Sequence, residues 1–120
     1  MRHLLVTNDY PPKVGGIQSY LWEIYRRLPQ DKVVVYTTPH PDSESFDQQQ
    51  THKIIRSKQR VLLPTKQVAN QIRSVAKDED IDFIMYDPAV PIGMLGPKIR
   101  IPYGVILHGA EVTIPGRVPI

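Results

Sequence analysis

The sequence predicts an α/β domain built on a doubly wound, mainly parallel sheet. Short apolar runs alternate with stretches whose apolar residues recur at helical spacing, which is typical of strands joined by crossover helices. The chain has 120 residues, which suits one domain, and 41% of them are hydrophobic, enough for a buried core. No internal repeat is visible, so we expect a single domain over residues 1–120.

The first part of the chain predicts a strand, a helix and a second strand. His3–Thr7 is short and apolar and ends at turn-forming residues. Val33–Thr37 is apolar and β-branched throughout, as expected for a strand covered on both faces. Between them, the spacing predicts a helix that Pro29 stops, with one apolar face formed by Ile17, Tyr20, Leu21, Ile24, Tyr25 and Leu28.

The middle of the chain predicts one long helix preceded by weaker signals. Pro39–Gln50 is polar and contains two prolines, which predicts a surface loop. Lys53–Arg56 and Arg60–Leu63 are short strand candidates, and we expect at least one to join the sheet. Pro64-Thr65 opens a helix that continues to Lys77, whose inner stripe is Val68, Ala69, Ile72, Val75 and Ala76.

The last part of the chain predicts two more strands. Phe83–Tyr86 is followed by Asp87-Pro88, and Pro91–Leu95 allows a short helix before Gly96-Pro97 breaks the pattern. Tyr103–Leu107 is a further strand that ends at His108-Gly109. Ala110–Ile120 shows no regular element, and because a doubly wound sheet normally continues, we expect the domain to be incomplete at its C-terminus.

Composition excludes several classes of protein. The absence of cysteine excludes a disulfide scaffold, a zinc-finger site and a thiol nucleophile. No apolar run approaches the roughly 20 residues that cross a bilayer. The N-terminus turns polar at Thr7 and lacks the apolar stretch of a secretory signal. A soluble cytoplasmic domain is therefore the expectation.

A block of one charge sign lies in the middle of the chain. Residues 48–77 contain seven Lys or Arg and no acidic residue, although the net charge of the whole chain is only +3. Such a block suits an anionic surface, so a non-catalytic basic module on an anionic membrane is one functional alternative. A solvated helix face is the plainer alternative. Nucleic acid is disfavoured because the block holds no aromatic residue to stack on bases.

Candidate binding residues gather where the predicted strands end, since ligands of open parallel sheets bind at the carboxyl edge. Gly15-Gly16 opens the first helix, where free N–H groups and the helix dipole attract an anion such as phosphate. A glycine turn that merely admits the helix is the alternative. The chain lacks the Gly-x-Gly-x-x-Gly and Gly-Lys-Ser/Thr motifs, which argues against a nicotinamide-dependent oxidoreductase and a P-loop protein.

His108 follows the last predicted strand and is the candidate for a chemical role. Its imidazole can hydrogen-bond a sugar hydroxyl or a phosphate, or act as an acid or base, and Gly109 would let a ligand approach. We expect His3, His40 and His52 to be structural. The histidines and carboxylates do not have the spacing of a metal site, so no metal is expected.

Three motifs together resemble a known family. They are Val6-Thr7-Asn8-Asp9-Tyr10-Pro11-Pro12, Gly15-Gly16-Ile17-Gln18-Ser19-Tyr20-Leu21, and Leu107-His108-Gly109-Ala110-Glu111 followed by Pro115-Gly116-Arg117. In this order they resemble the N-terminal, Rossmann-like half of GT-B-fold retaining glycosyltransferases of glycosyltransferase family 4. Among these, the sequence looks most like the actinobacterial phosphatidylinositol-mannoside α-mannosyltransferases.

The resemblance implies a role for each matching residue. Gly15 and Gly16 would lie against the diphosphate of a sugar nucleotide such as GDP-mannose, and His108, with Gly109 beside it, would contact the transferred sugar. A lipid or glycan acceptor would approach this domain, with Tyr10, Lys13 and Gln18 as candidate contacts. The helix from Thr65 to Lys77 would dock on the anionic inner face of the plasma membrane through Lys66, Arg73 and Lys77. The transfer would retain the anomeric configuration and need no cofactor or metal.

The resemblance also implies a missing part. In the family, a C-terminal domain carries the nucleotide pocket and the positive charges that neutralise the leaving diphosphate, an effect worth several kcal/mol. Because those groups are not in this sequence, the chain alone is expected to be inactive. A separate chain that carries the second Rossmann-like domain is accordingly an expected partner.

Overall fold

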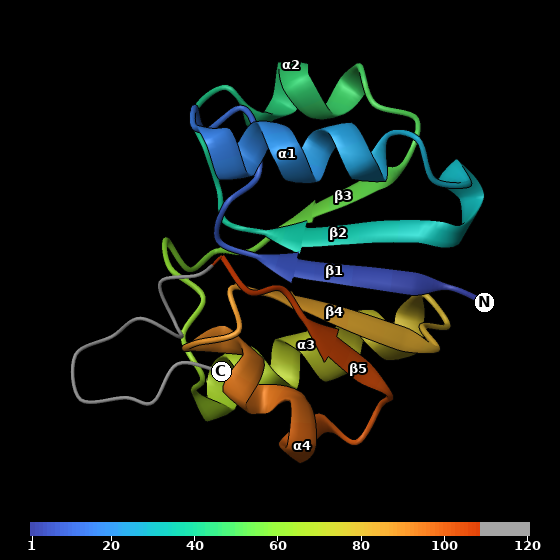
Figure 1. Cartoon of the computed structure of the whole chain (residues 1–120), viewed down its shortest axis with the longest axis vertical. Helices are drawn as coiled ribbons and strands as arrows, with labels where there is room; N and C mark the ends of the chain where they lie inside the picture. The colour runs from blue at the N-terminus through green and yellow to red at the C-terminus, as the bar shows by residue number, and fades with distance from the viewer. Residues whose placement is uncertain (109–120) are drawn as a thin grey trace.

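The computed structural model describes residues 1–108, in which five parallel strands form one sheet of order β3-β2-β1-β4-β5 (Figure 1). The strands are β1 (His3–Thr7), β2 (Val33–Thr37), β3 (Lys53–Arg56), β4 (Phe83–Asp87) and β5 (Tyr103–Val105). Their carboxyl ends meet at one edge, on the left of Figure 1. The predicted Rossmann-like, doubly wound fold is therefore confirmed.

Helices cover both faces of this sheet (Figure 1). One face carries α1 (Gly16–Tyr25) and α2 (Ser43–Gln48), and the other carries α3 (Lys66–Asp78) and α4 (Gly96–Ile99). Two short 3₁₀ helices, η1 (Gln30–Lys32) and η2 (Ile92–Leu95), precede β2 and α4 within the described residues. The 110–120 segment, expected to be irregular, lies outside the described residues.

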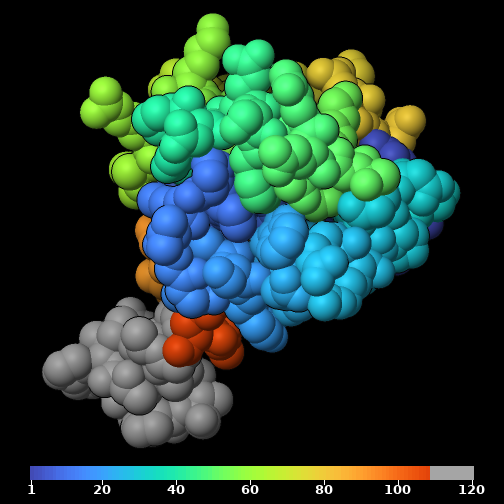
Figure 2. Space-filling view, turned by 90° about the horizontal axis from the view of Figure 1, so that it is seen from above, coloured from blue at the N-terminus to red at the C-terminus, as the bar shows by residue number. Residues whose placement is uncertain are grey.

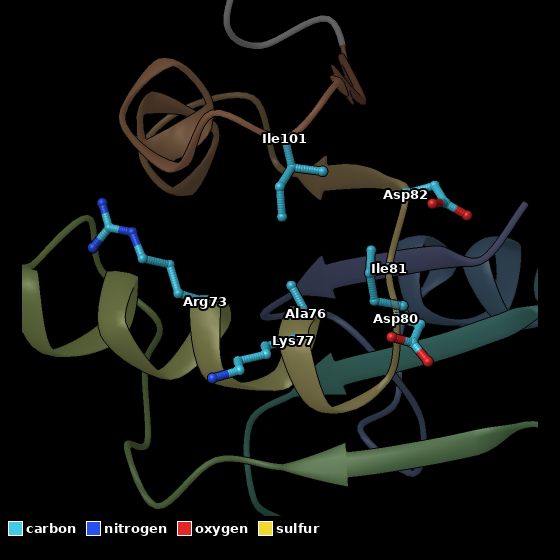
Figure 3. Close-up of a pocket in the computed structure, with 7 residues that line it drawn as sticks. All are labelled: Arg73, Ala76, Lys77, Asp80, Ile81, Asp82 and Ile101. Carbon is cyan, nitrogen blue, oxygen red and sulfur yellow. The ribbon is translucent and has the colours of Figure 1, made fainter.

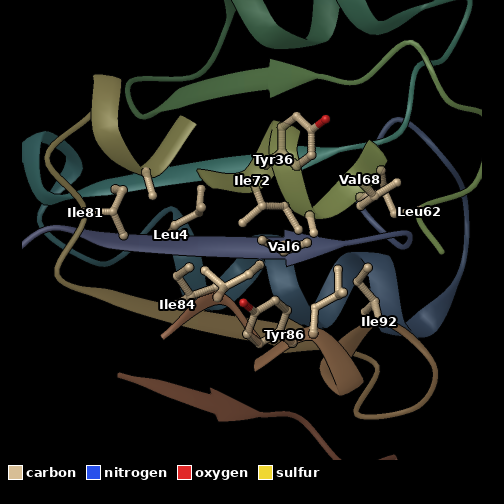
Figure 4. Packing of buried hydrophobic residues seen from close by; sticks show 14 of the residues in the cluster. Leu4, Val6, Tyr36, Leu62, Val68, Ile72, Ile81, Ile84, Tyr86 and Ile92 are labelled. Carbon is tan, nitrogen blue, oxygen red and sulfur yellow. The ribbon is translucent and has the colours of Figure 1, made fainter. Parts of the chain in front are cut away.

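Alternating side chains of the central strand supply both halves of the core. Leu4 and Val6 pack toward α3, where Figure 4 shows them in one cluster with Ile72. Leu5 points to the opposite face and packs with Leu21 of α1. Because β2 is covered on both faces, all of its residues are buried, as its apolar sequence predicted.

The long helix α3 agrees closely with its prediction. The Thr65 hydroxyl caps it by accepting a hydrogen bond from the Val68 N–H at 3.2 Å. Its predicted inner stripe is buried except for Val75, which is half-buried. A strongly amphipathic pattern thus located both the helix and its inner face.

The helix α1 differs from its prediction in length and orientation. It ends at Tyr25 instead of continuing to Leu28, and of the predicted apolar face only Leu21 and Tyr25 are fully buried. Tyr20 is 58% exposed, and Ile17 and Ile24 are also exposed. The helix contacts the sheet through a narrow strip, so an apolar residue one position away from that strip already faces outward.

Two shorter predictions were wrong and a third was confirmed. Pro39–Gln50 is not entirely loop, because it contains α2, which Phe46 anchors against the core. Of the two short strand candidates, of which at least one was expected in the sheet, Lys53–Arg56 joins it as β3 and Arg60–Leu63 forms no strand. Gly96-Pro97 does not end the helical region but begins α4, since proline is well tolerated in the first turn of a helix.

Candidate functional site

A row of polar side chains crosses the carboxyl edge of the sheet beneath the start of α1. Thr7 of β1 is in register with Thr37 of β2 on one side and with Asp87 of β4 on the other. All three residues are fully buried. They share the face that carries α1, because Leu5, two residues before Thr7, packs against that helix.

Asp87 is the centre of this row. One carboxylate oxygen, Oδ2, accepts a hydrogen bond from the Thr7 hydroxyl at 2.7 Å. The other oxygen, Oδ1, contacts Nε2 of His108. The Thr7 hydroxyl in turn accepts a hydrogen bond from the Asp9 N–H at 2.8 Å. The buried Asp87 carboxylate is thus bound by Thr7 of β1 and in turn contacts the imidazole of His108, which follows β5.

His108 lies at the boundary between this row and solvent. Its side chain is 19% exposed, whereas that of Asp87 is completely buried. The imidazole therefore has a fixed partner on the protein side and an accessible surface on the other. This is the arrangement needed by a group that must present a hydrogen bond to a ligand in a fixed orientation.

A second carboxylate connects the row to the glycine loop. The Gln18 side-chain N–H donates to Asp9 Oδ1 at 3.3 Å. Burial raises the pKa of the Asp9 carboxyl, and the nearby negative charge of Asp87 raises it further. A chain of hydrogen bonds therefore runs from Gln18 at the start of α1 through Asp9 and Thr7 to the buried Asp87, which contacts His108.

The start of α1 is open to a ligand. Gly15 is the N-cap, no side chain caps the helix, and the first turn contains no acidic residue. A Cβ placed on Gly16 would meet no atom within 4 Å. Backbone N–H groups at an uncapped N-terminus and the positive end of the helix dipole attract an anion, so the geometry fits the predicted phosphate contact.

The candidate acceptor residues have different positions. Tyr10 is only 1% exposed and belongs to the core, where its hydroxyl bonds His52 at 2.8 Å, so we leave it out of the proposed site. Lys13 is exposed, and its ammonium donates to the Asn8 carbonyl at 3.1 Å. Gln18 is half-buried and faces Asp9. Gly109 lies outside the described residues.

The candidate membrane residues are on the other face of the sheet. Lys66, Arg73 and Lys77 are exposed on α3. Arg73 and Lys77 line a hollow of about 420 Å³ together with Asp80 and Asp82, and Figure 3 shows these side chains. The basic side of α3 therefore borders acidic groups at the C-terminal end of the helix.

Sequence reasoning missed Asp87 as a site residue, although it predicted that a strand ends directly before it. The available signal was an acidic residue directly after a buried apolar run, where burial of a charge requires a partner. Its partners Thr7 and His108 could not be identified without the strand order, because they are far away in the sequence.

His52, one of the histidines predicted to be structural, is buried, and its hydrogen bonds show which ring nitrogen carries the proton. Gln30 donates its amide N–H groups to two carbonyls, so its Oε1 accepts, and the 2.8 Å contact means that Nδ1 of His52 donates. Nε2 is then the acceptor for the Tyr10 hydroxyl. Burial lowers the pKa of His52, and also that of His3.

We expect this protein to lose stability as the pH falls from about 7 toward 5. The unfolded chain takes up protons near the ordinary histidine pKa of 6.5, whereas folded His52 resists protonation, so stability is present above that value and is lost below it. The maximum slope is about 1.4 kcal/mol per pH unit for each such proton. Urea unfolding of the wild type and of His52→Asn at pH 7.5 and 5.0 measures this. An equal loss of stability in the two proteins would contradict it.

No helix within residues 1–108 is long and apolar enough to span a bilayer. In the same part of the chain, no group of three or more histidine and carboxylate side chains could hold a metal ion.

The fold and the edge site define a Rossmann-like domain with an uncapped helix start at the carboxyl edge of the sheet and a histidine held by a carboxylate. No family model matches the chain. Among curated proteins, it is 34% identical over 106 residues to a GDP-mannose-dependent alpha-(1-6)-phosphatidylinositol monomannoside mannosyltransferase of Mycobacterium tuberculosis, which covers 83% of this chain and 28% of the relative. The enzyme of that name from Mycolicibacterium smegmatis is 33% identical over 101 residues, or 81% of this chain and 26% of the relative.

A third relative supports the same relationship. The chain is 30% identical over 94 residues to a GDP-mannose-dependent monoacylated alpha-(1-6)-phosphatidylinositol monomannoside mannosyltransferase of Corynebacterium glutamicum, which covers 77% of this chain and 25% of the relative. The predicted relationship to actinobacterial phosphatidylinositol-mannoside mannosyltransferases is confirmed. The chain spans about a quarter of the length of these relatives.

Proposed function

We propose that this chain is the N-terminal, acceptor-side domain of a retaining mannosyltransferase. The enzyme transfers mannose from GDP-mannose to a phosphatidylinositol mannoside, the reaction class that the names of its relatives describe. The observation that carries the proposal is that the candidate binding groups lie together at the carboxyl edge of the sheet. There the open start of α1 and the Asp87-held His108 are joined by one polar row.

Different groups at this edge bind different parts of the donor. The backbone N–H groups that follow Gly15 attract the diphosphate of the donor. His108, oriented by Asp87, forms a hydrogen bond with a hydroxyl of the transferred sugar and fixes its position. Positive charge that neutralises the leaving diphosphate comes from the C-terminal domain that the family resemblance implies.

The proposal is tested with a chimera, in which this chain replaces the matching segment of the Corynebacterium glutamicum relative. We expect the chimera to transfer mannose from GDP-mannose to phosphatidylinositol monomannoside. The chain alone is the reference, and the chain mixed with the rest of the relative as a separate polypeptide tests assembly from two chains. A folded chimera without transfer, beside an active parent enzyme, would contradict the proposal.

The substitution Gly16→Val tests the donor contact. A Cβ at this position meets no protein atom within 4 Å, so we expect the fold to be retained, but the added side chain would occupy the space through which a diphosphate reaches the backbone. We expect the KM of the chimera for GDP-mannose to rise about tenfold, the loss of roughly one hydrogen bond to a charged group. Ser19→Val, at an exposed position on the same helix, is the matched control.

We further propose that the exposed side of α3 brings the enzyme to the inner face of the plasma membrane. Lys66, Arg73 and Lys77 are exposed on one helix and can meet anionic headgroups together. Sedimentation with vesicles of an anionic and a neutral lipid tests this: reversing these three charges to Glu should abolish salt-sensitive binding. Reversal of Arg26, Arg27 and Lys32, on the opposite side of the sheet, should not. Equal binding by both triple variants would exclude α3 as the contact.

A further inference from the structure

A second cavity lies at the carboxyl edge, beside the glycine loop. It has a volume of about 580 Å³, within the range of small-molecule sites. Its walls come from the loops that follow β1, β2 and β3, which Figure 2 shows gathered at one end of the molecule in blue, turquoise-green and light green. The lining residues are Lys13, Thr38, Pro39, His40, Pro41 and Arg60.

Two side chains hold these walls in place. The guanidinium of Arg56, which is 12% exposed, donates to the Thr38 carbonyl at 3.0 Å and to the Pro11 carbonyl at 2.8 Å. The Asn8 amide binds the backbone of Leu62 in both directions, accepting from its N–H at 2.7 Å and donating to its carbonyl at 3.0 Å. The three loops are therefore joined to one another by protein groups, and the cavity does not depend on a ligand for its shape.

The groups that line the cavity suit an anion. None of the lining residues is acidic, and two of them, Lys13 and Arg60, are cations. Within residues 1–108 neither of these cations forms an ion pair. His40 adds a donor, because its Nδ1 accepts from the Asp42 N–H at 3.0 Å and a neutral imidazole then carries its proton on Nε2.

We infer that this cavity binds the phosphodiester of a phosphorylated polyol, the headgroup of the lipid acceptor. The inference rests on the proposed function, because the relatives act on phosphatidylinositol mannosides by name. Lys13 and Arg60 take the phosphate oxygens, His40 supplies a third hydrogen bond, and Pro39 and Pro41 form rigid apolar walls. Lys13 is two residues from Gly15, so the acceptor phosphate lies next to the donor loop.

The test is a calorimetric titration of the 120-residue chain with glycerophosphoinositol, the headgroup without acyl chains. We expect binding that weakens with salt, and about tenfold weaker binding for Arg60→Gln or Lys13→Gln. Lys58→Gln is the matched control, because Lys58 is an exposed cation of the same loop that does not line the cavity. Circular dichroism of each variant confirms that it remains folded.

Two further titrants identify the source of the phosphate. Inorganic phosphate should bind more weakly than glycerophosphoinositol, and myo-inositol alone should not bind. Equal binding of inorganic phosphate and glycerophosphoinositol would mean a site for free phosphate and would overturn the inference, as would equal weakening by Lys58→Gln. These titrations do not require catalysis, so an inactive chimera with intact headgroup binding would contradict the proposed function and leave this inference standing.

Discussion

Replacing Asp87 by asparagine is expected to lower kcat for mannosyl transfer by the chimera about 30-fold. The Asp87 carboxylate contacts Nε2 of His108, and it is buried completely. A hydrogen bond to a charged group is worth about 2 kcal/mol, which corresponds to about a 30-fold change in rate. The asparagine amide has the size of the carboxylate but is a weaker hydrogen-bond acceptor for His108. The substitution is therefore expected to act on the orientation of the imidazole.

The KM for GDP-mannose separates this positioning role from a general loss of structure. The proposed diphosphate contacts lie at the start of α1 and do not involve Asp87, so KM should change less than twofold. Thr7→Ser, which retains the hydroxyl that donates to Asp87, should behave as the wild type, whereas Thr7→Val should reproduce part of the loss. If Asp87→Asn leaves kcat unchanged while His108→Ala abolishes transfer, Asp87 does not act through the imidazole.

Replacing Arg56 by alanine is expected to lower the free energy of unfolding by about 3 kcal/mol. Arg56 binds both oxygens of Asp47, at 3.2 Å from Nε and 2.8 Å from the second guanidinium nitrogen, and also donates to two loop carbonyls. Its removal leaves a partly buried carboxylate and the carbonyls without their donor. Urea unfolding of the chain measures the loss.

Arg27→Ala is the matched control for this measurement. Arg27 also forms an ion pair, with Glu23, but the exposed fractions of the two side chains are 59% and 43%. Exposed pairs contribute less than about 1 kcal/mol, because water screens the charges and the side chains lose freedom when they pair. Similar losses for the Arg27 and Arg56 variants would show that burial does not set the strength of these interactions.

The parts of the fold that sequence predicted are those with strong periodicity. β2 is apolar from Val33 to Tyr36 and α3 has a clear inner stripe, so the need to bury these apolar residues specifies both elements. The missed helix α2 is polar along its length and depends on Phe46, one apolar anchor, and on tertiary contacts such as the Gln50 oxygen that accepts from Trp22 at 2.8 Å. A polar pattern of this kind looks the same as a loop.

The candidate site was predicted in outline but not in its connections. The rule that ligands bind at the carboxyl edge placed Gly16 and His108 there from sequence alone. The pairing of His108 with Asp87 requires β4 to lie between β1 and β5. The sequence does not show this strand order, which is seen only in the structure. Tyr10 illustrates the reverse problem, because nothing in the sequence distinguishes an aromatic residue on a binding loop from one that folds back into the core.

The two-way bond between Asn8 and Leu62 has a mechanical consequence. Leu62 is fully buried and lies three residues before Thr65, the residue that caps α3. We therefore expect a displacement of the segment after β1 to reach the first turn of α3, on the far side of the sheet. If the donor and membrane contacts proposed above hold, nucleotide binding and bilayer binding would be coupled, and each would alter the affinity of the other by an equal factor.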